Sequence, residues 1–492
     1  MRKLVIVAAL GGTAFADARL HPVHTSTGAI EAGGHTYTSQ QAYFTSPEWQ
    51  ASGGRCGTAP VEPSDVPAAL AATDCSASAT HINQAYLDGK TYVIQVVMHV
   101  VSDSQGNGAI TDAQVQSQIQ ILNEDYQAQA GSHGAPGNNA GIKFVLARFD
   151  PQGNPTTGID RVTNDAYFSE GDSGTSAMKT ALHWDTSKYL NLYSNNLDGQ
   201  GLLGYATFPW DRTKNASNTN VDGVVLAYQS VGNNPSYAPY DLGASATHEI
   251  GHWLGLFHTF QSGCGTTSAP YTSGDLISDT TREKAANYGC TAVADGCNDN
   301  MNAPIENYMD YSQDACMTTF TTEQINRMRC GINNYRTVNT EPTAAFSFTN
   351  AGLVVTFANT STDLESMPTA LHYNWDFGDG MTSTDQNPVH TYASGGSYDV
   401  TLEVVDPMSA ANTVKQSVML NVTTPDGPPD AAVANPPDAG AGGGGGGAGG
   451  DAGTGGASST GGGCCQAPGG GLSFLLTAMP VGLALVRRRR RR

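Results

Sequence analysis

Residues 248–258 have the sequence HEIGHWLGLFH, which follows the pattern H-E-x-x-H-x-x-G-x-x-H. On a helix, His248 and His252 lie one turn apart on the same face, so both imidazoles can reach one metal ion. Gly255 can end that helix with a positive φ, which turns the chain and brings His258 round as a third ligand. Three protein ligands leave a fourth position open, and this arrangement is typical of catalytic rather than structural zinc.

Glu249 follows the first ligand and points into the same cleft, where its carboxylate can take a proton from a water molecule held by zinc. The short pattern H-E-x-x-H arises by chance in ordinary helices. The long pattern fixes five positions, so a random match has a probability of roughly (1/20)^5 per window. The sequence therefore predicts a catalytic zinc site with Glu249 as general base, rather than a surface helix with three unrelated histidines.

The charge balance of the chain is strongly acidic. It has 492 residues, with 24 Lys and Arg against 44 Asp and Glu, and a formal net charge of −20. Eight of the basic residues lie in the two terminal segments, and without them the remainder carries roughly −28. Because phosphate binding needs the opposite sign, we expect no nucleic-acid partner.

The first 16 residues have the three parts of a secretory signal. Arg2 and Lys3 form a basic region, residues 4–10 are apolar, and Ala14-Phe15-Ala16 offers a cleavage site of small residues. We therefore expect residues 1–16 to be a signal peptide and the protein to be secreted. Export places the cysteines in an oxidising compartment, where disulfides persist.

Composition and periodicity divide the rest of the chain. Residues 17–80 are polar with little periodicity and suit a pro-segment better than an independent core. Residues 81–340 predict an α/β domain. Its expected strands are 92–101, 142–148, 190–193, 202–209 and 224–228, and its expected helices are 111–126 and 245–254. Asp112 offers capping chemistry at the start of the first helix.

The C-terminal third changes character near residue 341. Residues 341–424 alternate apolar and polar positions in short runs, as an all-β sandwich does. Residues 425–463 are rich in Gly, Pro and Ala and predict a flexible linker. Residues 464–492 end in a short apolar run with Pro480 and then six arginines. The run is short for a bilayer span, which needs about 20 residues, so a stop-transfer signal that is later removed fits better than a permanent helix.

Residues 307–311, NYMDY, resemble the Met-turn of the metzincin zinc peptidases. Within that clan, HEIGHWLGLFHTF and NYMDYSQDACMTTFT are most similar to the pappalysin family. The resemblance implies an α/β (α+β) catalytic domain with a mixed sheet and a zinc helix, and endopeptidase activity on proteins. It also implies that Met309 supports the three histidines and that Tyr311 hydrogen-bonds the tetrahedral intermediate. An extended substrate would pair antiparallel with the edge strand expected at 202–209.

The same resemblance implies further site residues. Family members bind Ca²⁺ between the zinc helix and the Met-turn, and Asp275 and Asp279 are the candidates here. The alternative is a solvated acidic loop. Asp314 lies near the position that sets the preference for the residue after the scissile bond, and an acidic pocket would favour Arg or Lys. The family pattern suggests the disulfides Cys264–Cys297 and Cys290–Cys316, although sequence alone allows three connectivities.

Residues 55–58, RCGT, resemble the cysteine switch of latent metzincins. A Cys56 thiolate would occupy the open zinc position, and removal of the pro-segment would then create activity. The competing interpretation is a Cys56–Cys75 disulfide, since two neighbouring cysteines in a secreted chain often bond. If Cys56 stays free, Cys75 and Cys330 remain to pair.

Two C-terminal features also resemble known modules. WDFGDG at 375–380 and PVHTY at 388–392 resemble a PKD domain, an immunoglobulin-like sandwich in which Trp375 and Tyr392 would fill the core. The tail resembles a myxosortase-type sorting signal that would attach the protein to the cell surface, the alternative being a simple membrane anchor. The alternative function is a catalytically inert adhesin that binds through the PKD-type module. Such a protein would be expected to lose a ligand or the base, and neither is lost here.

Overall fold

The computed structural model describes residues 22–25, 29–59, 86, 89–171, 176–211 and 218–420. The predicted signal peptide, linker and sorting tail lie outside these residues, and so does Cys75. Within the described residues, no helix is both long enough and apolar enough to cross a membrane.

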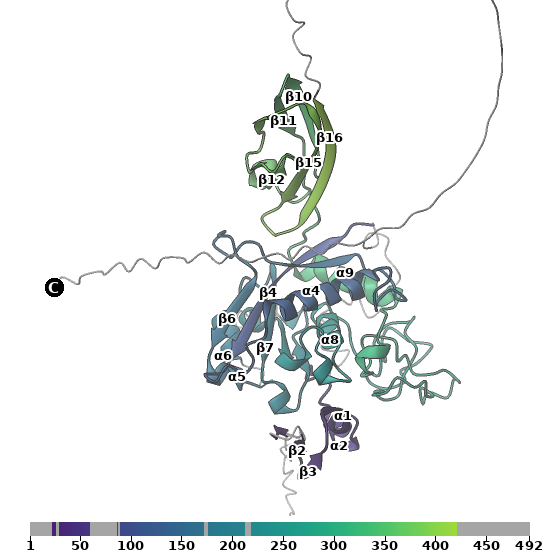
Figure 1. Cartoon of the computed structure of the whole chain (residues 1–492). Coiled ribbons are helices and arrows are strands. Elements are labelled where there is room, and N and C mark those ends of the chain that lie inside the picture. Colours follow the sequence, from purple (N-terminus) through teal and green to yellow (C-terminus); the bar gives the residue numbers. More distant parts are fainter. Residues whose placement is uncertain are drawn as a thin grey trace, which may run out of the picture. The chain divides into compact units, whose positions relative to one another are not determined.

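A mixed six-stranded sheet forms the framework of the catalytic domain (Figure 1). Its strands are β4 (Tyr92–Ser102), β5 (Ile142–Leu146), β6 (Ile159–Thr163), β7 (Tyr189–Asn195), β8 (Gly204–Ala206) and β9 (Val224–Ala227). The order is β5-β4-β7-β9-β8, and β6 pairs with the second half of β4. All neighbours are parallel except β8, which runs antiparallel to β9 at the edge. The predicted edge strand is therefore present, although shorter than 202–209.

Helices cover both faces of this sheet because successive strand residues point to opposite sides. On one face, α4 (Asp112–Gln127) and α8 (Ala244–Trp253) share a hydrophobic core with β4 and β7. On the other face, α5 (Asp165–Phe168) and α6 (Ala177–Leu182) bury Phe168 and Met178 against Val101 and Tyr193. The zinc motif thus lies on a helix that is buried along its whole length.

Local capping explains where the long helices begin. Thr111, not Asp112, caps α4, and it forms a capping box with Gln114. The prediction for Asp112 was wrong because this residue is already helical, where its carboxylate pairs with Arg161. A second capping box, Thr321 with Gln324, starts α9 (Thr322–Tyr335), a helix that the sequence analysis did not predict. The described residues also contain short 3₁₀ helices at Asp198–Gln200, Asn218–Val221, Tyr228–Ser230, Pro235–Tyr237, Asp314–Cys316 and Pro368–Ala370.

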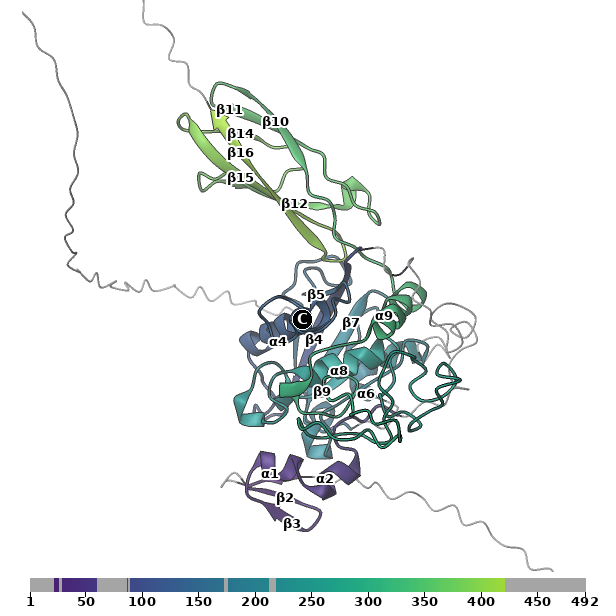
Figure 2. The same ribbon diagram turned by 90° about the vertical axis from the view of Figure 1, so that its right-hand side faces the viewer.

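The described part of the expected pro-segment is folded. It contains strands β1 (Val23–His24), β2 (Ile30–Ala32) and β3 (His35–Tyr37) and helices α1 (Gln40–Phe44) and α2 (Pro47–Ser52). Figure 2 shows these elements, in purple, grouped together. Their apolar residues are in a cluster that also includes Leu203, Tyr237 and Tyr240 of the catalytic domain. The segment therefore builds no core of its own, which agrees with its weak periodicity.

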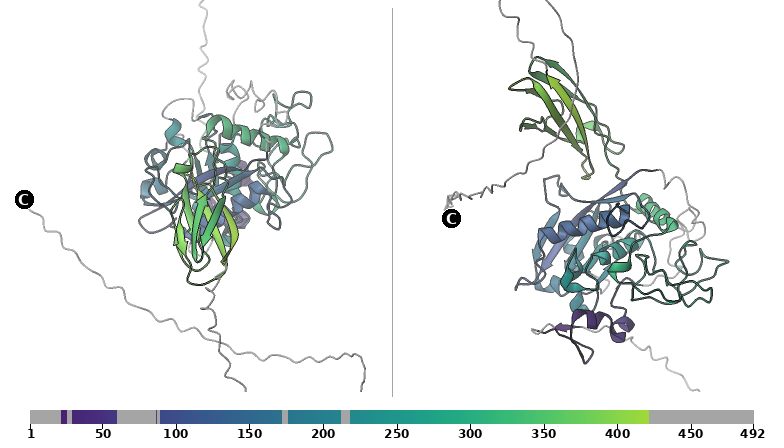
Figure 3. Two further views of the ribbon diagram at one scale, coloured as in Figure 1. Left: turned by 90° about the horizontal axis from the view of Figure 1, so that it is seen from above. Right: turned by 45° about the vertical axis from the view of Figure 1, so that its right-hand side comes forward.

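The PKD-type region is a two-sheet sandwich (Figure 3). One sheet contains β10 (Phe346–Ala351), β11 (Val354–Asn359) and β14 (Val389–Thr391). The other contains β12 (His372–Asp376), β13 (Thr382–Ser383), β15 (Gly396–Val405) and β16 (Ala411–Leu420). Trp375 and Tyr392 are both buried between the sheets, and each donates a hydrogen bond to a backbone carbonyl. The core role expected for both residues is confirmed.

Candidate active site

Three histidines converge at the C-terminal end of α8. His248 and His252 lie one turn apart on the helix, which ends at Trp253. Gly255 then adopts φ 105°, a left-handed conformation that favours glycine, and the chain turns so that His258 joins the other two. One ligand atom from each histidine and the sulfur of Cys56 all lie within 4.8 Å of one another, and all four residues are buried.

The donor atoms of this cluster fit a zinc ion. Nδ1 of His248 lies 2.6 Å from the carbonyl oxygen of Tyr308, and Nδ1 of His252 lies 2.7 Å from that of Leu256. A carbonyl only accepts, so each Nδ1 carries the hydrogen and each Nε2 turns its lone pair toward the centre. Nε2 of His252 lies 3.0 Å from Nε2 of His258, while Nε2 of His248 is buried and has no hydrogen-bond partner in the described part of the chain. Orphaned, converging lone pairs are what a tetrahedral zinc site requires.

Burial also sets the protonation state of the ligands. It lowers the pKa of His252 to about 4 and the pKa values of His248 and His258 well below their ordinary value. All three imidazoles are therefore neutral near pH 7, which is the form that binds a cation.

Glu249 is buried beside the ligands and faces the edge strand. Burial raises its pKa to about 7. Its Oε2 accepts hydrogen bonds from Thr58 Oγ1 at 2.9 Å and Cys56 Sγ at 3.3 Å, whereas no described residue donates to Oε1. Gly204 of β8 makes room for this side chain, because a Cβ there would lie 2.6 Å from Glu249 Cγ. The sequence alone does not indicate this role for Gly204, since it depends on a contact between distant segments.

Met309 lies beneath the zinc helix and is fully buried. A Cβ on Gly251 would overlap the sulfur atom of Met309. The absence of a side chain at Gly251 therefore leaves the space that Met309 fills. The turn before Met309 also supplies the Tyr308 carbonyl that orients His248. The same turn therefore supplies both the apolar side chain beneath the helix and the carbonyl that orients His248.

Tyr311 lies next to the ligands on the open side. Its ring centroid is 4.9 Å from that of His258 and 5.8 Å from that of His248. Its hydroxyl donates to the carbonyl oxygen of Cys56 at 3.5 Å. The phenol thus reaches the backbone carbonyl of the residue whose sulfur lies with the three histidines.

The segment around Cys56 runs through the cleft along β8. Cys56 is a free, buried thiol, so the alternative Cys56–Cys75 disulfide is wrong. Leu203 N donates to Gly54 O at 3.0 Å, and Gly57 N donates to Gly204 O at 2.8 Å. Residue numbers rise together on both segments, so the pro-segment runs in the same direction as β8. An antiparallel substrate would run the opposite way.

Arg55 fills a pocket next to the metal site. Its guanidinium donates to Ser245 Oγ at 2.9 Å, lies 3.8 Å from the Asp314 carboxylate and stacks over the Tyr240 ring. Both charged side chains are fully buried. Asp314 is held by the backbone amides of Leu242 and Ala244, at 3.0 and 3.2 Å. The pocket therefore already holds a basic side chain opposite a fixed carboxylate.

The loop between the zinc helix and the Met-turn carries two disulfides and a cavity of about 360 Å³. The disulfides are Cys264–Cys297 and Cys290–Cys316, the two pairs that the resemblance implies. Cys330 is also disulfide-bonded, and its predicted partner Cys75 lies outside the described residues.

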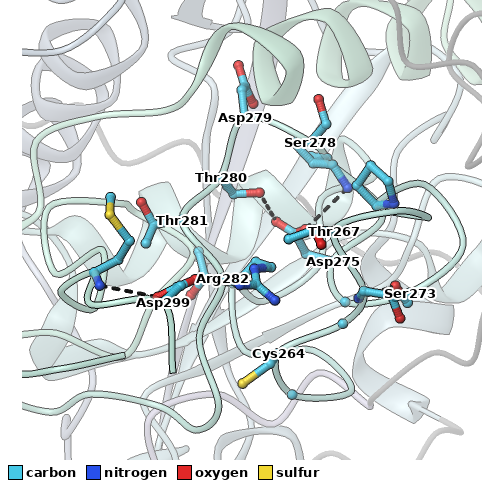
Figure 4. A pocket seen from close by; sticks show the side chains of 18 residues that line it. Cys264, Thr267, Ser273, Asp275, Ser278, Asp279, Thr280, Thr281, Arg282 and Asp299 are labelled. Carbon is cyan, nitrogen blue, oxygen red and sulfur yellow. Dashed lines mark hydrogen bonds and ion pairs between the residues drawn. The ribbon is translucent and has the colours of Figure 1, made fainter. Parts of the chain in front are cut away.

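Asp275 and Asp279 line this cavity (Figure 4). Asp275 accepts from Thr280 Oγ1 at 2.6 Å, and its backbone carbonyl accepts from Arg327 at 2.9 Å. Asp279 accepts from the backbone amide of Glu323 at 2.9 Å. Both carboxylate oxygens of Asp275 and one of Asp279 therefore already accept from protein donors.

A second acidic cluster, formed by this loop together with the Met-turn, was not predicted. Glu283, Asp295 and Asp310 are all buried. Burial, and then the charge of Asp310, raises the pKa of Glu283 to about 9. Oε1 of Glu283 and Oδ2 of Asp295 have no hydrogen-bond partner among the described residues. Buried carboxylate oxygens without donors suit a hard cation.

The fold and the site define a class of zinc peptidases. A zinc helix with H-E-x-x-H, a third histidine after a glycine turn and a methionine turn beneath them characterise the metzincin metalloendopeptidases.

Comparisons with known proteins narrow this class. The profile described as pregnancy-associated plasma protein-A, of the peptidase M43 family, matches residues 172–333, and a PKD domain profile matches 339–422. An extracellular metalloprotease of Pyricularia oryzae is 38% identical over 289 residues, which cover 57% of this chain and 89% of that protein. Mature mirolysin of Tannerella forsythia with a cleaved peptide is 37% identical over 50% of this chain and 96% of that one, with a TM-score of 0.42. A promirolysin mutant is 32% identical over 57% and 94%, with a TM-score of 0.45.

The chain belongs to the pappalysin (M43) family of extracellular zinc metalloproteases, and it carries a PKD domain after the catalytic domain. It is an enzyme, so the alternative of an inert adhesin is set aside.

Proposed function

We propose that the protein is made as a latent endopeptidase that cleaves extracellular proteins in an extended conformation. The observation that carries this proposal is the convergence of three neutral histidines, a buried Glu249 and a pro-segment thiol on one point. The edge strand β8 provides the backbone groups with which an extended peptide would pair.

Two side chains would perform the proton and charge chemistry. A bound zinc ion would polarise the scissile carbonyl and lower the pKa of a water molecule. Glu249 would accept the proton of the attacking water and later deliver it to the leaving amine. Tyr311 would donate a hydrogen bond to the oxygen that becomes negative, as its hydroxyl donates to the Cys56 carbonyl in the latent form.

Latency would follow from Cys56. Its sulfur lies with the three histidines, so its thiolate would take the fourth zinc position and exclude water. Thr58 and Cys56 also occupy the carboxylate of Glu249. The base and the open metal position are therefore blocked together until the pro-segment leaves.

The Arg55 pocket supports a preference for Arg or Lys after the scissile bond. One oxygen of the Asp314 carboxylate has no hydrogen-bond donor within the described ranges, and this oxygen faces the guanidinium. When Arg55 leaves on activation, the buried carboxylate of Asp314 would have no cation beside it. A basic side chain of the substrate would restore this ion pair.

We place the proposed Ca²⁺ at Glu283, Asp295 and Asp310 rather than at Asp275 and Asp279. Oε1 of Glu283 and Oδ2 of Asp295 have no donor among the described residues, and Asp310 adds a third buried carboxylate. Both carboxylate oxygens of Asp275 and one of Asp279 already accept from protein donors. A cation there would stabilise the disulfide-linked loop that leads to the Met-turn.

The N-terminal signal and the C-terminal tail support export followed by attachment to the cell surface. In this proposal the arginine cluster holds the tail at the membrane until it is removed, and Cys464 or Cys465 is modified. The PKD domain would then extend the peptidase from the surface.

Mass spectrometry of a peptide library tests the activity and its preference together. Processed enzyme should cleave before Arg and Lys, and a zinc chelator should abolish the cleavage. Glu249→Ala should keep zinc, measured by metal analysis, and lose turnover by orders of magnitude. Undiminished hydrolysis by this variant would exclude the assigned base.

A further inference from the structure

The catalytic domain has an aromatic surface beside the active site, which we call the shelf. It consists of Leu203, Tyr237, Tyr240 and Tyr288. These residues come from three separate stretches of the catalytic domain, and none of them is a zinc ligand. The shelf is covered by the N-terminal piece, defined here as residues 29–59.

The N-terminal piece is attached to the shelf through two rings. Phe44 lies edge-on to Tyr237 and to Tyr240, with centroids 5.2 Å apart in both pairs. Trp49 lies 5.5 Å from Tyr240 and 5.9 Å from Tyr288. Both Phe44 and Trp49 are at most 1% exposed, so the contact is dry. Buried aromatic pairs of this geometry are among the stronger contacts in protein interfaces.

Polar contacts fix the same piece at two further places. The Tyr288 hydroxyl donates to the Gln50 carbonyl at 2.9 Å. Arg55 enters the Asp314 pocket, where it is fully buried. These contacts, like the ring contacts, involve neither the zinc ligands nor the chain that joins the piece to the catalytic domain.

The two helices of the N-terminal piece are also capped by residues of the piece itself. Ser39 caps α1, while Ser46 caps α2, which has Pro47 at its first position and Gly53 in the left-handed conformation at its end. The aromatic residues are thus presented by elements whose ends do not depend on the catalytic domain.

We propose that the N-terminal piece stays bound to the shelf after the connecting chain is cut, and that the cut protein remains inhibited. Activation then requires a second event, the destruction of the piece itself. This inference rests on the proposed function and adds the manner of its regulation. Cutting the connection removes an effective concentration of the order of mM, so retention requires a dissociation constant below about 1 µM.

The experiment uses the full chain with a recognition sequence for a site-specific protease inserted between residues 59 and 89. The Glu249→Ala form is cut and passed over a sizing column at about 1 µM, which reports retention without self-cleavage. The form with Glu249 intact is cut in parallel, and its rate of peptide hydrolysis is followed during serial dilution.

We expect the fragment to co-elute with the catalytic domain and the rate to stay within a few-fold of the uncut protein. Phe44→Ala combined with Trp49→Ala should release the fragment and raise the rate at least tenfold. His35→Ala, an exposed ring in the same piece, is the matched control and should behave like the parent. Should the double variant not fold, Tyr237→Leu on the shelf should speed fragment release.

Immediate loss of the fragment from the cut parent, with full activity, would overturn the proposal. Retention of the fragment without inhibition would overturn it as well. Failure of the proposed function gives a different pattern: the fragment is retained by the Glu249→Ala form, but the fragment-free double variant hydrolyses no peptide.

Discussion

At the scale of single residues, the site depends on side chains that touch neither metal nor substrate. Asp125 of α4 accepts a hydrogen bond from Thr247 Oγ1 at 2.6 Å, immediately before the first zinc ligand. Burial, and then the nearby charge of Asp125, raises the pKa of Tyr308, whose carbonyl orients His248. One carboxylate therefore bonds the zinc helix and lies close to the Met-turn.

Replacing this carboxylate should weaken the metal site. Asp125→Ala should lower peptidase activity and zinc affinity by about 10-fold, the low end of the effect of removing a direct partner of a metal ligand, because Asp125 acts through Thr247. Asp125→Asn keeps an acceptor for Thr247 and should recover part of both. Zinc titration and kcat/KM provide the measurements. Glu124→Gln, next to it on the surface of α4, is the control, and an equal loss in both variants would argue against the role of Asp125.

Gly204 offers a test of how closely Glu249 is positioned. Because a Cβ at Gly204 would meet Glu249 Cγ at 2.6 Å, Gly204→Ala should displace the base while leaving the histidines in place. We expect kcat to fall on the order of 100-fold, since a shift of about 1 Å has that effect. Zinc content should not change. Gly396→Ala, which meets only distant atoms of Tyr398, should be silent.

At the scale of elements, the helical period of the motif was sufficient to predict the zinc ligands, because two of them are local neighbours and the third follows a glycine turn. Gly204, Asp125 and the Glu283 cluster could not be predicted in this way. Each acts through a contact between segments far apart in sequence, and no periodicity records such a contact. The helix α9 was missed although its capping signature, Thr321 and Gln324, is visible in the sequence.

The acidic cluster in the disulfide-linked loop predicts a pH effect. Without Ca²⁺, burial and Asp310 raise the pKa of Glu283 from 4.5 to about 9. The native state then holds a proton that the unfolded state has lost, so stability falls as pH rises from about 4.5 toward 9. The slope is at most about 1.4 kcal/mol per pH unit for one proton. Ca²⁺ replaces that proton, so its stabilising effect should grow between pH 5 and 8.

Thermal unfolding with and without Ca²⁺ across this pH range provides the measurement. Glu283→Gln removes the charge and should reduce both the slope and the Ca²⁺ effect, whereas Glu306→Gln, exposed in the same loop, should change neither. A Ca²⁺ effect that is independent of pH and unchanged in Glu283→Gln would place the cation elsewhere.

At the scale of the whole molecule, the proposed latency would combine a thiol at the metal site, Arg55 in its pocket and the rings on the shelf. Cys56→Ser replaces the thiol by a poor zinc ligand. The full-length variant should hydrolyse peptides at least tenfold faster than the latent parent, yet more slowly than processed enzyme, because the other anchors remain. After the pro-segment has been removed, variant and parent should have equal rates. If the full-length variant hydrolyses peptides as slowly as the latent parent, the thiol contributes little to inhibition.

The parallel course of residues 54–58 along β8 has a consequence for the design of ligands. In a segment that runs parallel to β8, the carbonyls lie where an antiparallel substrate would have its amides, and the amides lie where it would have its carbonyls. No peptide bond of the segment is therefore aligned with Glu249 and Tyr311 for attack. The zymogen can thus keep a basic side chain in its own pocket without being cut there. A short synthetic peptide that copies this polarity, with arginine followed by a zinc-binding thiol, would be an inhibitor that its target cannot digest.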